Sequence, residues 1–335
     1  MSAHPSVSRV GVPVVDEATQ TAAVDVTFDV SLPSEWQRRG ESPSGVQAKE
    51  VVRFDFPSSF PLAAPKVSLR PDFSRDLAHM QPWLADQRPV PCIYEGRLTE
   101  LLHQEGLQAI VNQTSEWLER AALGTLIDPG QGWEPVRRDS FQDYIVADAD
   151  RLRRLLSRPG GYRFFPFLYL TGVNHPVFLH GMIRDQTVHL DPSAVPDVFG
   201  ETPIGNAQQL RRGRSLALVV WPVRQHSSED LPICDTYLPE TVTDLSELRE
   251  RAQLYGCGAG LNSGLSWLQT CLSAYPRAGP FPLAVILLAQ RPFHIIGSDT
   301  STELCPYVTS IRSPDVFALG EAEHVRPAAH HHAIT

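Results

Sequence analysis

The chain has 335 residues, a formal net charge of −9 at pH 7 and 42% apolar residues. This length favours two domains, and this composition is that of a globular protein with a real core. Nucleic acid is not expected as a partner, because the sequence has no Lys/Arg-rich block to displace counterions from phosphates.

The cysteines and the apolar runs further limit the kind of protein that this chain can be. The longest apolar run, residues 283–289, is too short to cross a bilayer, and the N-terminus has no apolar signal segment, so we expect a cytoplasmic protein without a membrane partner. The five cysteines are scattered without a C-x-x-C pair, which disfavours a disulfide framework or a zinc site. We therefore expect no metal site and free thiols in a reducing compartment.

The first third of the chain predicts an antiparallel meander followed by a helix. Apolar side chains alternate with polar ones around Val24–Val30 and again around residues 52–56, which indicates half-buried strands. Residues 10–15 and 67–69 supply two shorter strands, and the polar, Gly/Pro/Ser-rich stretch 34–48 predicts a loop. Residues 106–122 then show the i, i+3, i+4 apolar spacing of an amphipathic helix.

The rest of the chain mixes strands and helices, which makes the predicted fold class α+β. We predict a first domain over residues 1–130, a linker over 131–142, an α/β domain over 143–319 and a linker-like tail over 320–335. Strands are expected at residues 164–170, 177–179, 216–220, 283–289, 293–296 and 307–311. Helices are expected at residues 245–255 and 261–275.

One loop of the first domain holds a candidate nucleophile. Cys92 lies in residues 89–96, PVPCIYEG, where prolines on both sides stiffen the backbone. A thiolate can carry an acyl group as a thioester, and nearby cations such as Arg88 and Arg97 would lower the pKa of the thiol. The simpler interpretation of an isolated cysteine is a small buried apolar side chain.

Residues 22–123 resemble the ubiquitin-conjugating enzyme family. The resemblance lies in the order of the strands and in the cysteine loop and helix that follow them. It also lies in residues 56–67, FPSSFPLAAPKV, which are similar to the aromatic-Pro-x-x-Pro-Pro-x-Val segment of that family. Residues 117–122 and 131–135 look most like the divergent bacterial branch, in which a conjugating domain is often fused to an activating domain.

This resemblance implies a fold, an activity and partners. It implies an N-terminal ubiquitin-conjugating-like fold, a four-stranded antiparallel meander with flanking helices, in which Cys92 carries a ubiquitin-like protein and passes it to a target protein. It implies an activating enzyme or domain as a partner, and bacterial antiviral defence as the setting. No cofactor is expected in this chain: ATP belongs to a separate or missing adenylation domain, which we expect beyond Thr335, and residues 143–319 are expected to be a degenerate adenylation-like domain.

The chain departs from the family pattern before its cysteine. The family has a His-Pro-Asn triplet there, whose Asn supports the loop and the oxyanion, whereas no Asn lies between Lys66 and Cys92. His79 and Gln81 are the candidate substitutes for oxyanion or loop support. The residues Asn174-His175-Pro176 follow the cysteine and are interpreted as a chance similarity.

Two other functions remain open at this stage. The chain could be a non-catalytic ubiquitin-conjugating-like binding module with Cys92 buried, or an unrelated cysteine hydrolase that uses His79 or His103. Glu95 and Asp86 are candidates for orienting an incoming amine. Residues 256–260, GCGAG, are expected to form a turn between two helices and not a nucleotide loop, because the preceding segment has a helical pattern.

Overall fold

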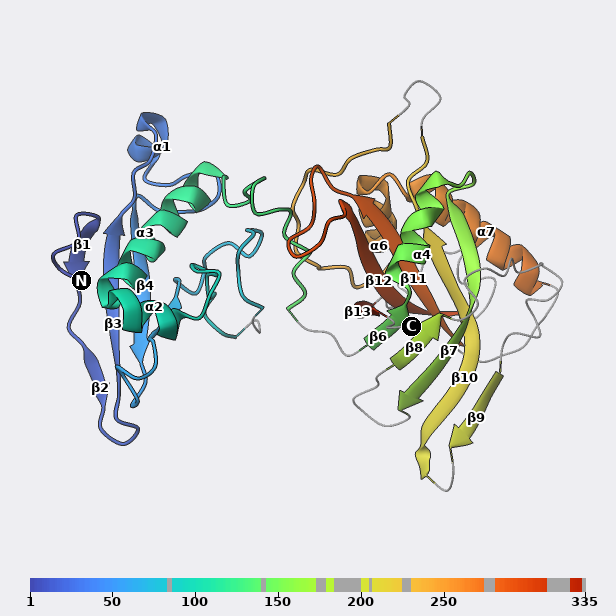
Figure 1. The fold of residues 1–335 in the computed structure, drawn as a ribbon, viewed down its shortest axis with the longest axis horizontal. Coiled ribbons are helices and arrows are strands. Elements are labelled where there is room, and N and C mark those ends of the chain that lie inside the picture. The colour runs from blue at the N-terminus through green and yellow to red at the C-terminus, as the bar shows by residue number, and fades with distance from the viewer. Residues whose placement is uncertain are drawn as a thin grey trace. The chain divides into compact units, whose positions relative to one another are not determined.

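The structure, a computed structural model, has the predicted mixed α+β architecture, with an antiparallel sheet at the N-terminus and a second sheet domain after it (Figure 1). It describes residues 1–82, 86–139, 143–172, 179–183, 200–204, 207–224, 230–273, 281–311 and 326–332. Two compact units divide the chain: Met1–Ser140 with Tyr237–Pro239, and Phe141–Thr236 with Glu240–Thr335.

The sheet of the first unit has one strand more than the predicted four. Its order is β1-β3-β4-β5, and β2 pairs with the same strand as β1, namely β3. The predicted strand at residues 10–15 is split, since β1 ends at Val10 and β2 begins at Val14; Pro13 between them has no N–H to donate to a ladder. The strands are β1 (Val7–Val10), β2 (Val14–Asp16), β3 (Thr21–Asp29), β4 (Lys49–Phe56) and β5 (Lys66–Ser68).

Three helices accompany this sheet. The predicted helix is α3 (Leu107–Leu123), and α2 (Leu98–Glu105) precedes it across Gly106, whose φ of 79° turns the chain. A third helix, α1 (Ser34–Arg39), corrects the prediction of a loop over residues 34–48. This helix buries none of its residues, so it has no apolar face that a sequence pattern could show.

The core of the first unit lies between the sheet and α3. Val26 and Phe28 of β3 are fully buried, whereas Asp25 and Asp29 beside them are exposed, which is the predicted alternation. Ile110 and other buried residues of α3 belong to the same apolar cluster. Burial of each such side chain contributes about 1.5–3 kcal/mol, so the sheet and α3 stabilise each other.

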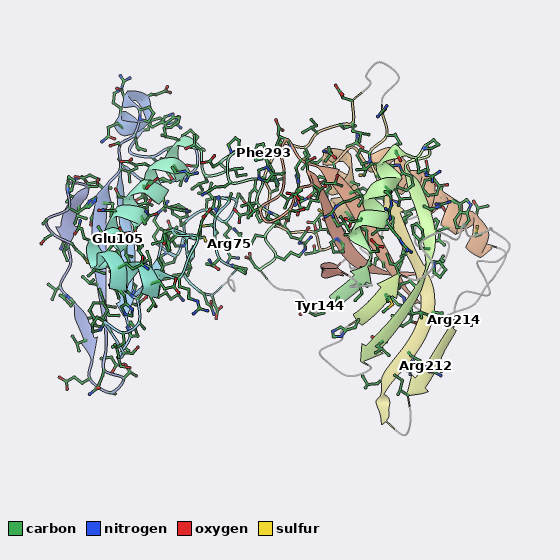
Figure 2. The ribbon with its side chains drawn as sticks, in the orientation of Figure 1. Arg75, Glu105, Tyr144, Arg212, Arg214 and Phe293 are labelled. Carbon is green, nitrogen blue, oxygen red and sulfur yellow. The ribbon has the colours of Figure 1, made fainter. Side chains whose placement is uncertain are left out.

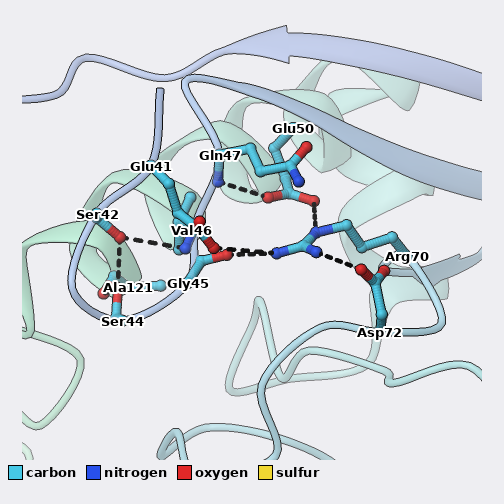
Figure 3. A network of polar contacts seen from close by, with 10 residues as sticks. All are labelled: Glu41, Ser42, Ser44, Gly45, Val46, Gln47, Glu50, Arg70, Asp72 and Ala121. Carbon is cyan, nitrogen blue, oxygen red and sulfur yellow. Dashed lines mark hydrogen bonds and ion pairs between the residues drawn. The ribbon is translucent and has the colours of Figure 1, made fainter. Parts of the chain in front are cut away.

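A buried ion pair ties β4 to the segment after β5, and further hydrogen bonds of the same two side chains reach the loop before β4. The side chain of Glu50 is completely buried, and its carboxylate accepts hydrogen bonds from Arg70 Nε at 3.0 Å and from the Gln47 N–H at 2.8 Å (Figure 3). Arg70 also donates to the Gly45 carbonyl and pairs with Asp72 at 2.9 Å. Every hydrogen-bonding group of this pair therefore has a partner, as burial requires.

Residues 131–139, expected to be part of a linker, pack within the first unit. Trp133 is buried, and its ring lies 6.5 Å from that of Tyr237. The buried Arg137 donates to the carbonyl oxygens of Arg75 and Leu77 at 2.6 and 3.2 Å. These contacts hold the segment after α3 against the loop that precedes Cys92.

The second unit is built on an eight-stranded mixed sheet of order β11-β12-β13-β6-β8-β7-β10-β9, and an additional parallel pairing of β10 with β11 closes it on itself. Its strands are β6 (Asp143–Ala147), β7 (Tyr162–Gly172), β8 (Leu179–Ile183), β9 (Gly200–Ile204), β10 (Ala207–Val220), β11 (Phe281–Gln290), β12 (Thr302–Ile311) and β13 (Arg326–His332). Its helices are α4 (Ala149–Arg153), the 3-10 helix η1 (Arg154–Ser157), α6 (Leu245–Leu254) and α7 (Gly258–Ser273).

The two faces of this sheet bury different layers. On β10, Leu216 and Leu218 contact the cluster that includes α6 and α7, whereas Ala217 and Val219 belong to the cluster that includes α4 and η1. Gly256, with a φ of 70°, turns the chain between α6 and α7, so the predicted turn between two helices is confirmed, although residues 258–260 already belong to α7.

Two expectations for the second unit need correction. Residues 293–296 are irregular, with a single bridge residue at Ile295, and do not form a strand. The linker-like tail predicted over residues 320–335 contains β13, which lies between β12 and β6. This strand forms through hydrogen bonds with segments that are distant in sequence, and its Pro- and His-rich sequence does not have the pattern of a strand.

Within the described residues, no helix is long and apolar enough to cross a membrane, and no group of His, Cys, Asp or Glu side chains is arranged to hold a metal ion.

The ion pair of Glu50 and Arg70 gives a test of stability. Arg70→Ala leaves a buried carboxylate without its cation, so we expect the first unit to lose about 3–5 kcal/mol. Hydrogen exchange of the β4 amides in the full chain, followed by mass spectrometry, measures this loss. Asp72→Asn is the matched control, because Asp72 is exposed, and should cost less than about 1 kcal/mol.

The same variant should show a defined pH dependence. Burial raises the pKa of Glu50, so the folded protein binds this proton more readily than the unfolded chain does. Stability then falls as pH rises through the folded-state pKa, and acidification should return part of what Arg70→Ala loses. A loss that is the same at pH 5 and pH 8 would contradict this account.

Candidate functional site around Cys92

The loop that carries Cys92 is held by a short antiparallel pairing with the segment that contains His79 and Gln81. The Cys92 N–H donates to the His79 carbonyl at 2.7 Å, and the Gln81 N–H donates to the Val90 carbonyl at 2.8 Å. Backbone hydrogen bonds therefore fix the position of the loop that carries the thiol.

Helix α3 is tied to the same point. Trp117 of α3 donates its indole N–H to the His79 carbonyl at 3.2 Å, so this oxygen accepts from both the cysteine loop and the helix. The Trp117 ring is buried and lies 6.1 Å from that of Phe73. The helix, the His79 segment and the cysteine loop thus form one hydrogen-bonded group.

Glu134 holds His79 from the segment after α3. His79 has a φ of 53°, which few residues other than glycine adopt. Its backbone N–H donates to the Glu134 carboxylate, and its ring Nδ1 lies 3.5 Å from Oε2 of the same carboxylate. These contacts offset a backbone conformation that costs about 1–3 kcal/mol.

Cys92 lies at the wall of a pocket of about 290 Å³ and is itself half-buried. The pocket is lined by residues of the cysteine loop, of α3 and of the segment after α3. They are His79, Cys92, Ile93, Tyr94, Glu95, Gln113, Glu116, Trp117, Arg120, Leu126 and Gln131.

The surroundings of Cys92 keep its thiol protonated. Burial is the largest cause that raises its pKa, and the negative charges of Glu134 and Glu95 raise it further. Hydrogen bonds to the Gln81 side chain and to the Tyr94 carbonyl, the latter at 3.9 Å from the sulfur, act in the opposite direction. The pKa is raised overall, so the thiolate is scarce at neutral pH.

His79 does not form a charged pair with this thiol. Burial lowers the pKa of its imidazole, and the positive charge of Arg120 lowers it further. Among the described residues, the ring makes no hydrogen bond with Cys92, so the arrangement that activates the nucleophile of a cysteine hydrolase is not present there.

The structure brings the three predicted site residues, Cys92, His79 and Gln81, together. Of the other candidates, Glu95 also lines the pocket, whereas Asp86, Arg88 and Arg97 do not. His103 is exposed, and its Nε2 lies 3.2 Å from the Pro61 carbonyl. The residues Asn174-His175-Pro176 fall outside the described part of the chain.

Several residues of this site were not predicted from the sequence, among them Glu116, Trp117 and Glu134. Trp117 and Glu116 lie on α3, at positions that a helical pattern cannot distinguish from an ordinary helix edge. Glu134 belongs to the segment 131–135, QGWEP, which carried part of the family resemblance without indicating a contact with the cysteine loop.

Comparison with known families places the first part of the chain. The model of the family described as Prokaryotic E2 family A matches residues 1–156. This part of the chain is thus similar to bacterial ubiquitin-conjugating-like proteins, as its sequence motifs indicated, and the similarity points to ubiquitin-like conjugation in general. None of the curated proteins matches the chain significantly.

The electrostatics of the pocket predict how a Glu134 variant behaves. Glu134→Gln removes a negative charge that raises the pKa of Cys92 but keeps an oxygen that can accept from the His79 N–H. We expect iodoacetamide to label Cys92 faster at pH 8 in this variant, because more of the thiol is ionised. Stopped time points analysed by peptide mass spectrometry measure the rate.

Two comparisons make this test specific. Glu119→Gln is the control, since Glu119 lies on α3 and does not line the pocket. In the unchanged protein the labelling rate should still rise between pH 8 and pH 9.5, because the pKa of Cys92 is raised. Equal rates for the two variants at pH 8 would show that Glu134 does not act on the thiol.

Proposed function

We propose that Cys92 carries the C-terminus of a ubiquitin-like protein as a thioester and transfers it to a nucleophile on a target protein, in bacterial antiviral defence. The observation that supports this most is a half-buried thiol at the wall of a pocket, on a loop that backbone hydrogen bonds hold in place. The similarity of residues 1–156 to a bacterial conjugating family adds to it.

The proposed reaction has two steps. In the first, the Cys92 thiolate attacks the activated carbonyl carbon at the C-terminus of the ubiquitin-like protein and a C–S bond forms. The bond from this carbon to the leaving group on the activating enzyme breaks, and the leaving group takes the electron pair. In the second, an amine of the target attacks the same carbon, a C–N bond forms, the C–S bond breaks, and the proton of the amine passes to solvent or to a carboxylate. ATP is used by the activating enzyme or domain, at an adenylation site outside the described residues.

Gln81 is the best candidate for stabilising the oxyanion of both steps. Its side chain already hydrogen bonds to Cys92, and its amide N–H₂ keeps a further donor for a developing negative charge. His79 supports the loop instead, because its N–H donates to Glu134 and its carbonyl accepts from Cys92 and Trp117. Glu95, Glu116 and Glu134 provide negative charge that favours the approach of a protonated amine.

The alternative is a binding module that makes no thioester. The raised pKa of Cys92 favours it, since a thiol that is mostly protonated reacts slowly. The pocket and the partial exposure of the cysteine favour the carrier, because a binding module has no need of a thiol at a pocket wall.

A loading assay separates these two functions. The full chain is incubated with its activating partner, ATP and the ubiquitin-like protein, and the products are resolved on a non-reducing gel. We expect an adduct that dithiothreitol removes, that Cys92→Ala abolishes, and that Cys92→Ser converts into an oxyester resistant to dithiothreitol. Cys271→Ala is the matched control, because Cys271 is the other half-buried cysteine, and it should load normally.

Two results decide the assignment. An unchanged adduct with Cys92→Ala excludes Cys92 as the carrier. For the biological setting, phage plating on cells that express the whole system should show protection, and Cys92→Ala should remove this protection if it depends on the thioester.

The role of Gln81 predicts a kinetic defect without a stability defect. Gln81→Leu removes the proposed oxyanion donor, so discharge of the loaded thioester to free lysine should slow by roughly 10²-fold. Gln81 is exposed, and therefore the hydrogen exchange of α3 should not change. A discharge rate within twofold of the unchanged protein would remove Gln81 from the mechanism.

A further inference from the structure

The sheet of the second unit carries a large groove on the face that α7 covers in part. The volume of the groove is about 740 Å³, within the range of protein binding sites. It is lined by strands β6, β7, β8, β9 and β10, through Val146, Leu168, Tyr169, Leu170, His180, Gly181, Met182, Thr202, Arg212, Gly213 and Arg214. Figure 1 shows that no helix of the described chain is drawn over the ends of β7, β10 and β9 that lie farthest from α7.

The strand register arranges these side chains in two parallel rows across the sheet. In one row, Leu170 lies between His180 of β8 and Arg212 of β10. In the other, Leu168 lies between Met182 of β8 and Arg214 of β10. The rows lie on one face, because their members alternate with buried residues such as Phe167 and Gly213 along each strand.

Each row has an apolar middle and a cationic end. Leu170 is 44% exposed and Met182 is 46% exposed, which is high for large apolar side chains in neighbouring strands. At the β10 end, the two arginines stand two residues apart and both are exposed (Figure 2). Neighbouring strands lie about 4.8 Å apart, so a row from β6 to β9 spans about 19 Å, the length of about six extended residues.

The arginines are not neutralised by the described part of the chain. Arg214 makes no hydrogen bond or ion pair there, and Arg212 makes a long contact of 3.4 Å from Nε to the Thr202 hydroxyl. The whole chain has a net charge of −9, so two nearby arginines without an ion pair in the described residues form a cationic spot on an acidic protein. A guanidinium group binds carboxylates through a matching pair of N–H donors.

We propose that this groove binds a short acidic and apolar segment of a partner protein. Aliphatic side chains of the segment lie on Leu168, Leu170 and Met182, and a carboxylate of the segment pairs with Arg212 and Arg214. The apolar middle favours this partner over nucleic acid or a free phosphate, which would leave Leu170 and Met182 exposed to water. This surface lies in the second unit, so its role does not depend on thioester chemistry at Cys92.

The proposal can be tested on the full chain with a defined probe. The probe is a fluorescein-labelled hexapeptide in which Asp and Leu alternate, and fluorescence anisotropy measures its binding at 50 and 200 mM NaCl. We expect the Kd to rise with salt, and to rise at least tenfold in the double variant R212E/R214E or in Met182→Asp. Arg154→Glu is the matched control, since Arg154 is an exposed arginine of the same unit outside the groove, and its Kd should match that of the unchanged protein.

Further measurements distinguish an acidic protein segment from a free phosphate as the ligand of the groove. The same hexapeptide with Asn in place of Asp should bind at least tenfold more weakly, and 10 mM inorganic phosphate should displace less than half of the acidic peptide. Hydrogen exchange should show protection of the β7 and β10 amides on binding, and circular dichroism should show that each variant is folded.

Several outcomes would overturn the proposal. They are no binding at 1 mM chain, equal binding of the Asp and Asn peptides, equal binding by R212E/R214E, and complete displacement by phosphate, which would indicate a phosphate site instead. A normal thioester adduct in the loading assay together with no peptide binding would reject the groove and leave the carrier function intact. Peptide binding without a thioester adduct would support the groove and reject the carrier function.

Discussion

One carbonyl oxygen, that of His79, organises the site. It accepts a hydrogen bond from the Cys92 N–H and another from the Trp117 indole, so the cysteine loop and α3 meet at one atom. Each of these hydrogen bonds contributes about 1 kcal/mol net to stability. Loss of both donors would cost more than the sum of the two, because the carbonyl oxygen would then be left without a hydrogen-bond partner. The left-handed backbone of His79, held by Glu134, places this carbonyl where both donors reach it.

The sequence predicted those parts of the first unit in which apolar and polar residues alternate regularly because one side of the element is buried. The alternation along β3 and the apolar face of α3 both arise because one side of each element packs against the other, and a regular pattern results. Helix α1 buries none of its side chains, and β13 forms through hydrogen bonds with segments distant in sequence. Neither element therefore has a periodic apolar pattern in the sequence. The division of β1 from β2 follows from Pro13, which breaks the ladder within a run that is otherwise strand-like.

For the candidate site, the sequence identified Cys92, His79 and Gln81 through their order along the chain and the family resemblance. It could not identify Glu134, because the effect of this carboxylate depends on the path of the chain after α3, which returns to the His79 segment. It also suggested the wrong sign for the local charge. The arginines that flank the loop, Arg88 and Arg97, do not line the pocket, and the charged groups that shift the pKa of the thiol are carboxylates.

The negative charge around Cys92 has opposite effects on the free thiol and on the proposed thioester. A raised pKa makes the thiolate scarce, which protects the free cysteine from unwanted reactions, and it makes the sulfur a poorer leaving group, which protects a thioester from water. A protonated amine that enters among Glu95, Glu116 and Glu134 would offset their charge and so lower the pKa of the departing thiol. The amine gives up its proton before it attacks, because an ammonium has no lone pair, and its nitrogen is cationic again in the tetrahedral adduct. This charge would improve the leaving group as the C–S bond breaks, whereas attack by hydroxide leaves no cation beside the sulfur. On this argument, the carboxylates that make Cys92 unreactive at rest also provide discrimination between transfer to an amine and hydrolysis.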